Sequence, residues 1–303
     1  MKKFGVIAIT ALAILLTGCG ISQKFHNHTI SENDVTAISI DSTSDFSVSR
    51  VVVLANGVAE IMNALNAKSI LVGRDISSTE KELKDIPIVT SGHQVMPEKV
   101  IELKPDLVII DASTGPKAAL DQIRNAGIKV VETPESWTLS DIPTKVSAVA
   151  SAIGAPQQGD LLNQAFAKEI KTSTIATKPR IAFLYLRGTS SVYLIGGPGS
   201  GSDSLIEAIG ATDVGAKSLP NPFNTMTAES LATLNPDVII VMTKGLQSVG
   251  GISGLLKLPG VAQTQAGKNQ AVIDVDDSLL LSYGPRTPSL VTALAKAVEV
   301  VTK

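Results

Sequence analysis

The chain has 303 residues, a hydrophobic fraction of 44% and a formal net charge of −2. This length suffices for two domains of ordinary size, and the apolar content suffices for a real core. The near-neutral charge and a pI near 6.0 give no indication of a nucleic-acid partner.

The first residues have the pattern of an export signal. Lys2 and Lys3 precede an apolar run over residues 4–16, which is too short for a comfortable transmembrane helix. The run ends in LTGC, which resembles a bacterial lipobox and implies cleavage before Cys19 and lipidation there. We therefore expect a signal peptide over residues 1–18 and a protein anchored by lipid to the outer face of the cell membrane.

Cys19 is the only cysteine of the chain. The sequence therefore excludes a disulfide, a cysteine-based zinc site and a thiol nucleophile in the folded part. Residues 20–47 are polar and rich in Ser, Thr, Asp and Asn, so we expect residues 19–47 to form a flexible tether. No later segment is apolar for long enough to span a bilayer.

From residue 48 onward, short β-branched runs alternate with helical patterns. This alternation predicts an α/β fold with a parallel sheet, and residues 48–140 are expected to form an N-terminal lobe. The expected elements are strand 51–54, helix 56–66, strand 69–73, helix 97–104, strand 107–110 and strand 128–131. Helix 97–104 begins with Pro97, and the run LVII at 107–110 is apolar enough to be buried on both faces.

Part of this pattern recurs later in the chain. The segment 227–240 matches the segment 96–109 at a constant offset of 131 residues, so that Glu98 corresponds to Glu229. A weaker similarity joins 61–73 with 205–215. Two matches in the same order favour a second lobe of similar plan, expected at residues 179–303.

Residues 141–178 have a helical period, with one interruption at Gly154-Ala155-Pro156. We expect them to form a long, largely rigid interdomain helix. The predicted fold class is thus α/β, with two Rossmann-like lobes of parallel strands joined by a helical spine. Such lobes leave a ligand cleft between the carboxyl ends of their strands.

These features together resemble the substrate-binding lipoproteins of ABC importers. The lipobox, the two similar lobes, the segment PEKVIELKPDLVI and the helical spine carry the resemblance, which covers the chain from Val51 onward. Within that family the chain looks similar to the class with a long interdomain helix that carries haem, siderophores or cobalamin. Haem binders of Gram-positive bacteria look closest.

This resemblance implies that ferric haem is the transported ligand and that each lobe supplies one axial iron ligand. In the N-terminal lobe the implied ligand is His93, the only histidine of the folded body; by itself it could equally be a solvated loop residue. In the C-terminal lobe the implied ligand is Tyr185, in the segment YLRG; it could instead pack in the core. Arg187 lies two residues on, hence on the same face of a strand, and could donate to the phenolate or be a surface cation.

A haem site also needs apolar walls and cations for the two propionates. The candidates for these roles lie near strand ends of the second lobe and before the last helix. They are Tyr193, Phe223, Met226, Met242, Tyr283 and Arg286. Tyr283 and Arg286 could equally cap the final helix.

Glu98 and Glu229 begin equivalent helices. In the family that the chain resembles, such acids dock onto arginines of the membrane permease, so the implied partners are the permease and ATPase subunits of an importer. The alternative role is stabilisation of the helix dipole, worth about 0.3–1 kcal/mol for each acid. We expect the protein to act as a monomer.

Other functions are disfavoured by the residue inventory. A ferric siderophore or a cobalamin is the alternative ligand for the same fold. A zinc or manganese receptor needs several His and carboxylate ligands, and a single body histidine argues against it. The glycine-rich run 196–202 lacks the Lys-Ser/Thr of a P-loop and indicates a strand-to-helix turn. Without HExxH, GxSxG or a reactive cysteine, we expect no enzyme.

Overall fold

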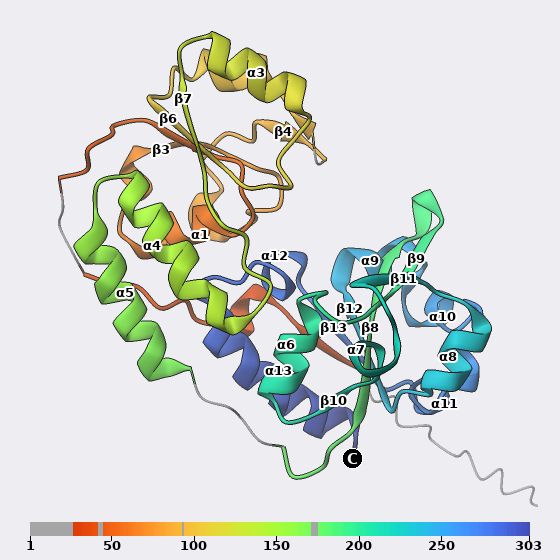
Figure 1. Cartoon of the computed structure of the whole chain (residues 1–303). Coiled ribbons are helices and arrows are strands. Elements are labelled where there is room, and N and C mark those ends of the chain that lie inside the picture. The colour runs from red at the N-terminus through yellow and green to blue at the C-terminus, as the bar shows by residue number, and fades with distance from the viewer. Residues whose placement is uncertain (1–26, 42–44, 93, 171–174) are drawn as a thin grey trace, which may run out of the picture.

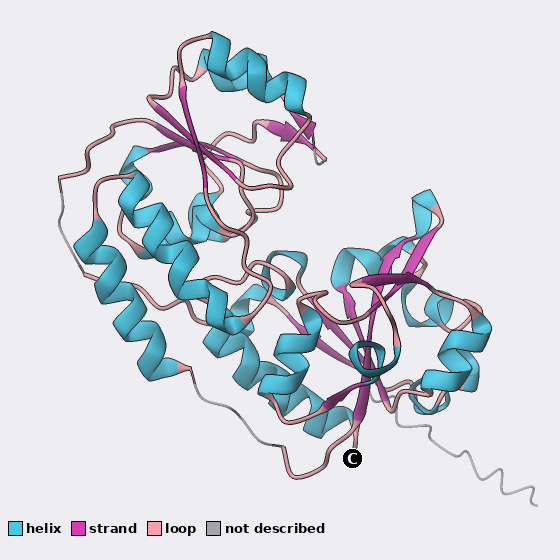
Figure 2. Cartoon of the chain, in the orientation of Figure 1, coloured by secondary structure: helices cyan, strands magenta, loops and turns pink. Residues whose placement is uncertain are grey.

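A computed structural model describes residues 27–41, 45–92, 94–170 and 175–303. The chain forms two α/β lobes, with the N-terminal lobe at the upper left of Figure 1 and the C-terminal lobe at the lower right. Each lobe has a central sheet with helices packed against it (Figure 2). The predicted fold class is confirmed.

The N-terminal lobe contains a four-stranded sheet in the order β3-β2-β6-β7, and all its neighbouring strands are parallel. A separate two-stranded hairpin, β4 and β5, lies beside it. The strands are β2 (Val51–Val53), β3 (Leu71–Arg74), β4 (Thr90–Ser91), β5 (Gln94–Val95), β6 (Leu107–Ile110) and β7 (Lys129–Glu132). The helices are α1 (Val58–Ala64), α2 (Pro97–Glu102) and α3 (Lys117–Asn125).

The C-terminal lobe contains a larger sheet in the order β1-β13-β12-β8-β9-β11, with β10 also paired to β8. The strands are β1 (His28–Ile30), β8 (Arg180–Arg187), β9 (Val192–Gly196), β10 (Thr212–Asp213), β11 (Phe223–Thr225), β12 (Val238–Met242) and β13 (Val272–Val275). The helices are α6 (Ser202–Ala208), α7 (Val214–Ser218), α8 (Ala228–Leu234), α9 (Thr243–Ser248), α10 (Gly251–Leu255), α11 (Gln265–Asn269), α12 (Asp277–Leu280) and α13 (Thr287–Val301).

This second sheet is mixed rather than purely parallel. Strand β9 runs antiparallel to β8, and β11 runs antiparallel to β9. The first residues of the long strand β8 pair with β10, whereas its last four residues pair with β9 on the same edge. The expectation of a parallel sheet therefore holds only for β13, β12, β8, β10 and the added strand β1.

The internal repeat corresponds to a repeated topology. The order β3-β2-β6-β7 in the first lobe has its counterpart in β10-β8-β12-β13 in the second. Helix α2 leads into β6 as helix α8 leads into β12, and these are the two segments with the constant sequence offset. The similarity of the segments therefore reflects equivalent positions in the two sheets.

Alternate strand residues face two different apolar layers. Val51 and Val53 of β2 contribute to a cluster that also includes Phe183 of β8, whereas Val52 faces a cluster confined to the N-terminal lobe. Ala182 of β8 faces a third cluster, confined to the C-terminal lobe. The first cluster runs through both lobes and helices α1, α4 (Ile142–Ala152) and α13, so the two sheets share one core at their junction.

The spine differs from the expected single helix. Helix α4 ends at Ala152, and α5 (Pro156–Glu169) folds back against it, so the two form an antiparallel hairpin (Figure 1). The amide of Asn163 donates to the carbonyl oxygen of Pro143 at 3.0 Å across this hairpin. The break falls at the predicted site, because Gly154 has a positive φ of 78° and Pro156 starts the next helix. None of the helices in the described ranges is long and apolar enough to cross a bilayer.

The N-terminal segment also differs from the expected tether. His28–Ile30 form β1, which pairs in parallel with β13 at the edge of the C-terminal sheet. The segment then crosses the lobe junction, where the Ile38 amide donates to the carbonyl oxygen of Pro285 and the Ile40 amide donates to that of Ala64 in α1. Residues 28–40 are therefore built into the fold by partners in both lobes, and a freely moving tether cannot extend across them.

Candidate functional site: a cleft between the lobes

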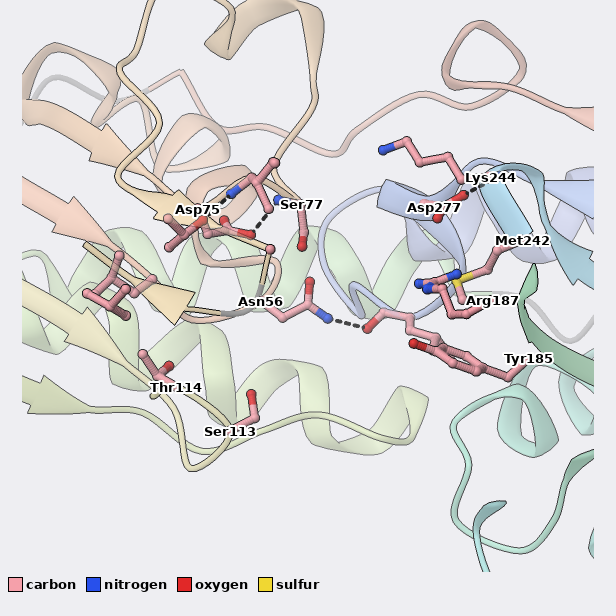
Figure 3. A pocket seen from close by; sticks show the side chains of 16 residues that line it. Asn56, Asp75, Ser77, Ser113, Thr114, Tyr185, Arg187, Met242, Lys244 and Asp277 are labelled. Carbon is pink, nitrogen blue, oxygen red and sulfur yellow. Dashed lines mark hydrogen bonds between the residues drawn. The ribbon is translucent and has the colours of Figure 1, made fainter. Parts of the chain in front are cut away.

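A cleft of about 420 Å³ lies between the two lobes, with walls from both of them (Figure 3). Most of its residues lie at or just after the carboxyl ends of β2, β3 and β6 in one lobe and of β8, β12 and β13 in the other, and the hairpin of β4 and β5 contributes Thr90, Gly92 and Val95. The carboxyl ends of parallel strands face the same edge of a sheet, so two such edges facing each other create the predicted ligand cleft.

The N-terminal wall of the cleft has an apolar base and a polar rim. The base consists of Leu54 and Val95, and the polar rim consists of neutral side chains together with one carboxylate. The rim residues are Asn56, Asp75, Ser77, Thr90, Ser113 and Thr114. Most of these groups are fixed by local bonds: for example, the hydroxyls of Ser113 and Thr114 both donate to Asp111, at 2.7 and 2.8 Å.

The C-terminal wall is built around Tyr185 and Arg187. Both are half-buried, and the guanidinium carbon of Arg187 lies 4.5 Å from the centre of the Tyr185 ring. The Tyr185 ring also meets Phe223 edge-on, with 5.8 Å between ring centres. The prediction that Tyr185 and Arg187 share one face of the strand is confirmed. The guanidinium approaches the face of the ring rather than its hydroxyl, and it donates to the carbonyl oxygen of Leu186 at 3.0 Å.

Three further residues complete this wall. Met242, at the end of β12, supplies apolar surface and was among the expected wall residues. Lys244 follows it at the start of α9, and its backbone N–H donates to the carboxylate of Asp277 at 2.9 Å. Figure 3 shows the Lys244 side chain extending from this wall toward the N-terminal wall.

One hydrogen bond crosses the floor of the cleft. The side-chain amide of Asn56, after β2, donates to the carbonyl oxygen of Leu281, after α12, at 2.9 Å (Figure 3). Both residues line the cleft, so this bond joins the lobes at the point where their walls meet.

Tyr193 and Met226 do not line the cleft. Tyr193 pairs with Leu186 in the β8–β9 hairpin and, like Leu186, packs against the cluster confined to the C-terminal lobe. Met226 is buried in the same cluster. Because strand side chains alternate between faces, Tyr193 points away from the face that carries Tyr185. The expectation that Tyr193 forms a pocket wall is therefore wrong.

Tyr283 is a core residue rather than a ligand contact. Its side chain is only 1% exposed, and its hydroxyl donates to the carbonyl oxygen of Gly201, in the glycine-rich turn between β9 and α6. Burial raises the pKa of this hydroxyl well above its ordinary value. Tyr283 thus ties the loop before α13 to the glycine-rich turn, and it lies outside the cleft lining.

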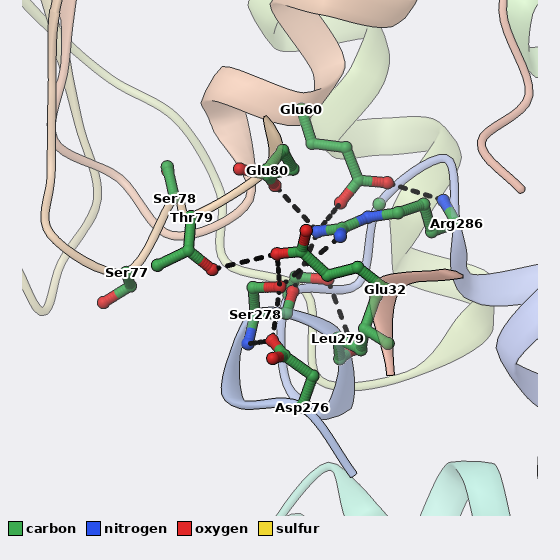
Figure 4. A network of polar contacts seen from close by, with 12 residues as sticks. Glu32, Glu60, Ser77, Ser78, Thr79, Glu80, Asp276, Ser278, Leu279 and Arg286 are labelled. Atoms are coloured by element: carbon green, nitrogen blue, oxygen red, sulfur yellow. Dashed lines mark hydrogen bonds and ion pairs between the residues drawn. The ribbon is translucent and has the colours of Figure 1, made fainter. Parts of the chain in front are cut away.

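Arg286 is also buried away from the cleft. It belongs to a group of polar side chains on the closed side of the lobe junction, shown in Figure 4, which we call the junction network: Glu32, Glu60, Glu80, Ser278 and Arg286. The Arg286 guanidinium contacts Glu60 at 3.1 Å and Glu80 at 2.7 Å. A guanidinium already bound by two carboxylates cannot serve a ligand propionate, so the expected propionate contact is wrong for Arg286.

Burial shifts the ionisation of groups near the junction. Burial and the neighbouring Glu60 carboxylate raise the pKa of Glu80 to about 7, against the opposing effect of Arg286. Burial lowers the pKa of Lys145 to about 8, although Asp111 and Glu60 favour its charged form, and its ammonium donates to the carbonyl oxygen of Ser282 at 3.0 Å. Burial also raises the pKa of Asp75, which lines the cleft.

Two expected site residues, His93 and Cys19, lie outside the described residues. Strand β4 ends at Ser91 and β5 begins at Gln94, and Gly92 lines the cleft with a positive φ of 56°. Gly92, which precedes the expected iron ligand in the sequence, therefore borders the cleft. Among the described residues, no group of three or more His, Cys, Asp or Glu side chains is placed to hold a metal ion.

Glu98 and Glu229 occupy equivalent exposed positions in the first turns of α2 and α8. Each helix is followed by a strand of its sheet that runs back toward the cleft, β6 or β12. The first turn of each helix therefore lies toward the carboxyl end of that strand, which is the side of the lobe that carries the cleft. Their role in docking remains a prediction.

Several cleft residues that were not predicted from the sequence share a common signal. Asn56, Asp75, Lys244 and Asp277 each follow the end of a predicted or observed parallel strand by one to three residues. Polar residues directly after buried strands could have been selected by the rule that ligands bind at the carboxyl ends of strands.

Comparison with known proteins places the chain in a family. A family model described as periplasmic binding protein matches residues 51–279, so the chain belongs to the periplasmic binding protein family. Over 98% of its length it is 28% identical to YvrC of Bacillus subtilis, an uncharacterized ABC transporter substrate-binding lipoprotein, of which it covers 97%. The predicted resemblance to substrate-binding proteins of ABC importers is confirmed.

The relatives differ in the ligand that their names state. A vitamin B12-binding protein of Vibrio parahaemolyticus is 23% identical over 67% of this chain and 74% of its own length. Among solved structures, the periplasmic heme-binding protein RhuT from Roseiflexus sp. RS-1, in its apo form, superposes with a TM-score of 0.79. It is 36% identical, and the match covers 84% of this chain and 99% of RhuT. The family and these relatives are substrate-binding transport proteins.

Proposed function

We propose that this protein is an extracellular haem receptor that delivers haem to the permease of an ABC importer. The observation that carries the proposal is the Tyr185–Arg187 pair, which lines one wall of the interlobe cleft while Gly92, next to His93, lines the other. The likeness to a heme-binding protein of the same fold supports this choice of ligand.

The chemistry of the two positions suits ferric haem. An imidazole nitrogen and a tyrosinate oxygen are both established ligands of haem iron. The guanidinium of Arg187 lies against the face of the Tyr185 ring, an arrangement that a cation–π attraction stabilises. With one iron ligand from each lobe, bound haem would hold the cleft closed, and separation of the lobes would release it.

The remaining walls suit a flat macrocycle with a polar edge. Leu54, Val95 and Met242 offer apolar surface at the base of the cleft. The hydroxyl and amide groups of the N-terminal rim and the cations of the C-terminal wall offer hydrogen bonds around it.

The location and the partners of the protein follow from the same proposal. Lipidation at Cys19 would hold the protein at the outer face of the cell membrane, as the lipobox indicates. Glu98 and Glu229 would contact cationic groups of the permease, one from each lobe. Because both acids are exposed on the cleft side of their lobes, their separation would change when the cleft closes.

Hemin titration of the full-length protein in lipid nanodiscs tests the proposal, with empty nanodiscs as the blank. We expect a Soret band that saturates and whose position changes in both His93→Ala and Tyr185→Phe. Tyr193→Phe is the matched control, because Tyr193 lies on the same hairpin but faces the lobe core. A wild-type protein that produces no spectral change with hemin would refute the haem proposal.

Cobalamin is the second candidate ligand, because relatives named as vitamin B12-binding proteins align with most of this chain. Under this alternative, cobalamin would occupy the same cleft that is proposed for hemin. Equilibrium dialysis with cyanocobalamin, and with a ferric siderophore, would identify the ligand if hemin fails to bind. Tight cyanocobalamin binding that Tyr185→Phe leaves unchanged would favour the alternative.

A further inference from the structure

The charged groups of the cleft are distributed unevenly between its walls. In the described part of the chain, the N-terminal wall carries no Lys or Arg, and its one carboxylate is Asp75. The C-terminal wall carries two cations, Arg187 and Lys244, together with Asp277. A ligand with an anionic edge would therefore meet both of its counter-charges on the C-terminal side.

The carboxylates of the cleft are already occupied by the protein itself. Asp75 accepts hydrogen bonds from the Ser77 backbone N–H at 2.7 Å and from the Ser78 hydroxyl. Asp277 accepts the backbone N–H of Lys244 at 2.9 Å. Both acids therefore stabilise local loop geometry, and neither forms an ion pair with Arg187 or Lys244.

The cations, by contrast, retain free donors. Within the described residues, no carboxylate lies within ion-pair distance of the Lys244 ammonium or the Arg187 guanidinium. Arg187 donates to the carbonyl oxygen of Leu186 and is held against the Tyr185 ring. Lys244 is exposed, and its side chain points toward the N-terminal wall (Figure 3). The ammonium of Lys244 is thus an exposed cation of the cleft that no carboxylate of the described residues pairs with.

We propose that Lys244 binds a carboxylate of the ligand and thereby selects for a carboxylate-bearing macrocycle. This inference rests on the proposed haem-binding function. An ammonium on a flexible four-carbon side chain can reach a carboxylate at the edge of the ligand. Arg187, in contrast, is held against the Tyr185 ring and would contact the face of the ligand. Lys244 then determines specificity for a carboxylate-bearing ligand. The iron ligands alone do not provide this selectivity.

The test combines a protein change with a ligand change. Full-length wild type and Lys244→Met in nanodiscs are titrated with hemin and with the dimethyl ester of hemin, which keeps the iron and the ring but carries no carboxylate. Methionine keeps an unbranched chain and removes the charge. Lys257→Met is the matched control, since Lys257 is an exposed lysine of the same lobe outside the cleft lining.

We expect Lys244→Met to weaken hemin binding about 10-fold, the loss of one charge-assisted contact, and to leave dimethyl ester binding unchanged. Lys244→Arg should restore hemin affinity to within about 3-fold, and added salt should weaken hemin binding less in Lys244→Met than in wild type. Lys257→Met should match wild type with both ligands.

Two results would overturn the inference, and they have different meanings. If wild type binds hemin but Lys244→Met weakens both ligands equally or neither, Lys244 does not bind a carboxylate, while the haem proposal stands. If wild type binds neither hemin nor its ester, the proposed function itself fails, and the inference fails with it.

Discussion

The two lobes meet in two regions of opposite character. On the open side, most of the polar groups that line the cleft are exposed or half-buried, and the bond from Asn56 to Leu281 crosses its floor. On the closed side, the junction network buries Arg286 between Glu60 and Glu80, which are 226 and 206 residues away in sequence. The same interface therefore holds the lobes together on one side and leaves polar groups of the other side accessible to a ligand.

A single loop takes part in both regions. Asp75 and Ser77 face the cleft, whereas Thr79 and Glu80 face the junction network (Figures 3 and 4). Arg74 fixes the course of this loop by donating to the carbonyl oxygens of Leu83 and Ser78. The loop therefore connects the wall that faces the ligand with the ion pairs that join the lobes.

Loss of Arg286 should have the largest effect on stability. Arg286→Met leaves two buried carboxylates without their cation, and breaking such a pair costs about 3–5 kcal/mol of unfolding free energy. Urea denaturation measures the loss. Lys117→Met is the control, because its ion pair with Asp121 is exposed to solvent and should contribute little to stability. Equal losses in the two variants would contradict a stabilising role for the junction network.

Substitution of a glycine at the lobe junction should have the second-largest effect on stability. Gly57 has a φ of 72°, and a Cβ there would overlap the carbonyl oxygen of Ser282 in the other lobe. Gly57→Ala should cost about 2–4 kcal/mol, from left-handed strain and overpacking together. Gly127→Ala is the matched control, with a φ of 79° but open space around the site, so it should cost only about 1 kcal/mol. If both substitutions cost the same, the approach of the two lobes at Ser282 is not tight.

The raised pKa of Glu80 predicts a pH dependence of stability. The folded protein keeps the Glu80 proton up to a pKa of about 7, whereas the unfolded chain loses it near 4.5. Stability from this group is therefore fully present below pH 4.5 and declines as pH rises toward 7, by on the order of 2–3 kcal/mol.

Urea denaturation between pH 4.5 and 8 measures that decline. Glu80→Gln should flatten the profile relative to wild type, since the amide does not titrate. Glu82→Gln, two residues away and exposed, should keep the wild-type profile. A Glu80→Gln profile parallel to that of wild type would show that another group is responsible.

The hydrogen bond across the cleft floor should have the smallest effect. Asn56→Ala removes an exposed bond whose partners can turn to water, so the cost should be about 0.5–1.5 kcal/mol. Urea denaturation beside Arg286→Met measures the contrast between the two sides of the interface. A cost for Asn56→Ala as large as that for Arg286→Met would remove the distinction between an open and a closed side.

Short-range pattern predicted a large part of the fold and of the site. The strand at 107–110 was predicted with its observed bounds, because four consecutive apolar residues between turn signals leave few alternatives. Tyr185 and Arg187 were predicted to share one face because side chains alternate along a strand. In the structure the guanidinium carbon of Arg187 lies 4.5 Å from the centre of the Tyr185 ring. The break of the spine was located because Gly154 and Pro156 act locally on the backbone.

The roles of other candidate residues depend on contacts with residues that are distant in the sequence. Arg286 was expected at a ligand and is instead neutralised by Glu60 and Glu80, and Tyr193 faces the core because of its pairing with Leu186.

By itself, the sequence determined the α/β alternation and the repeat of the two lobes, because these depend on patterns of neighbouring residues. Only the tertiary structure decided which polar groups meet the cleft and which are neutralised at the junction, and that α5 folds back on α4. The physical reason is that a charge or a ring takes its role from the partners that burial brings to it, and those partners come from distant parts of the chain.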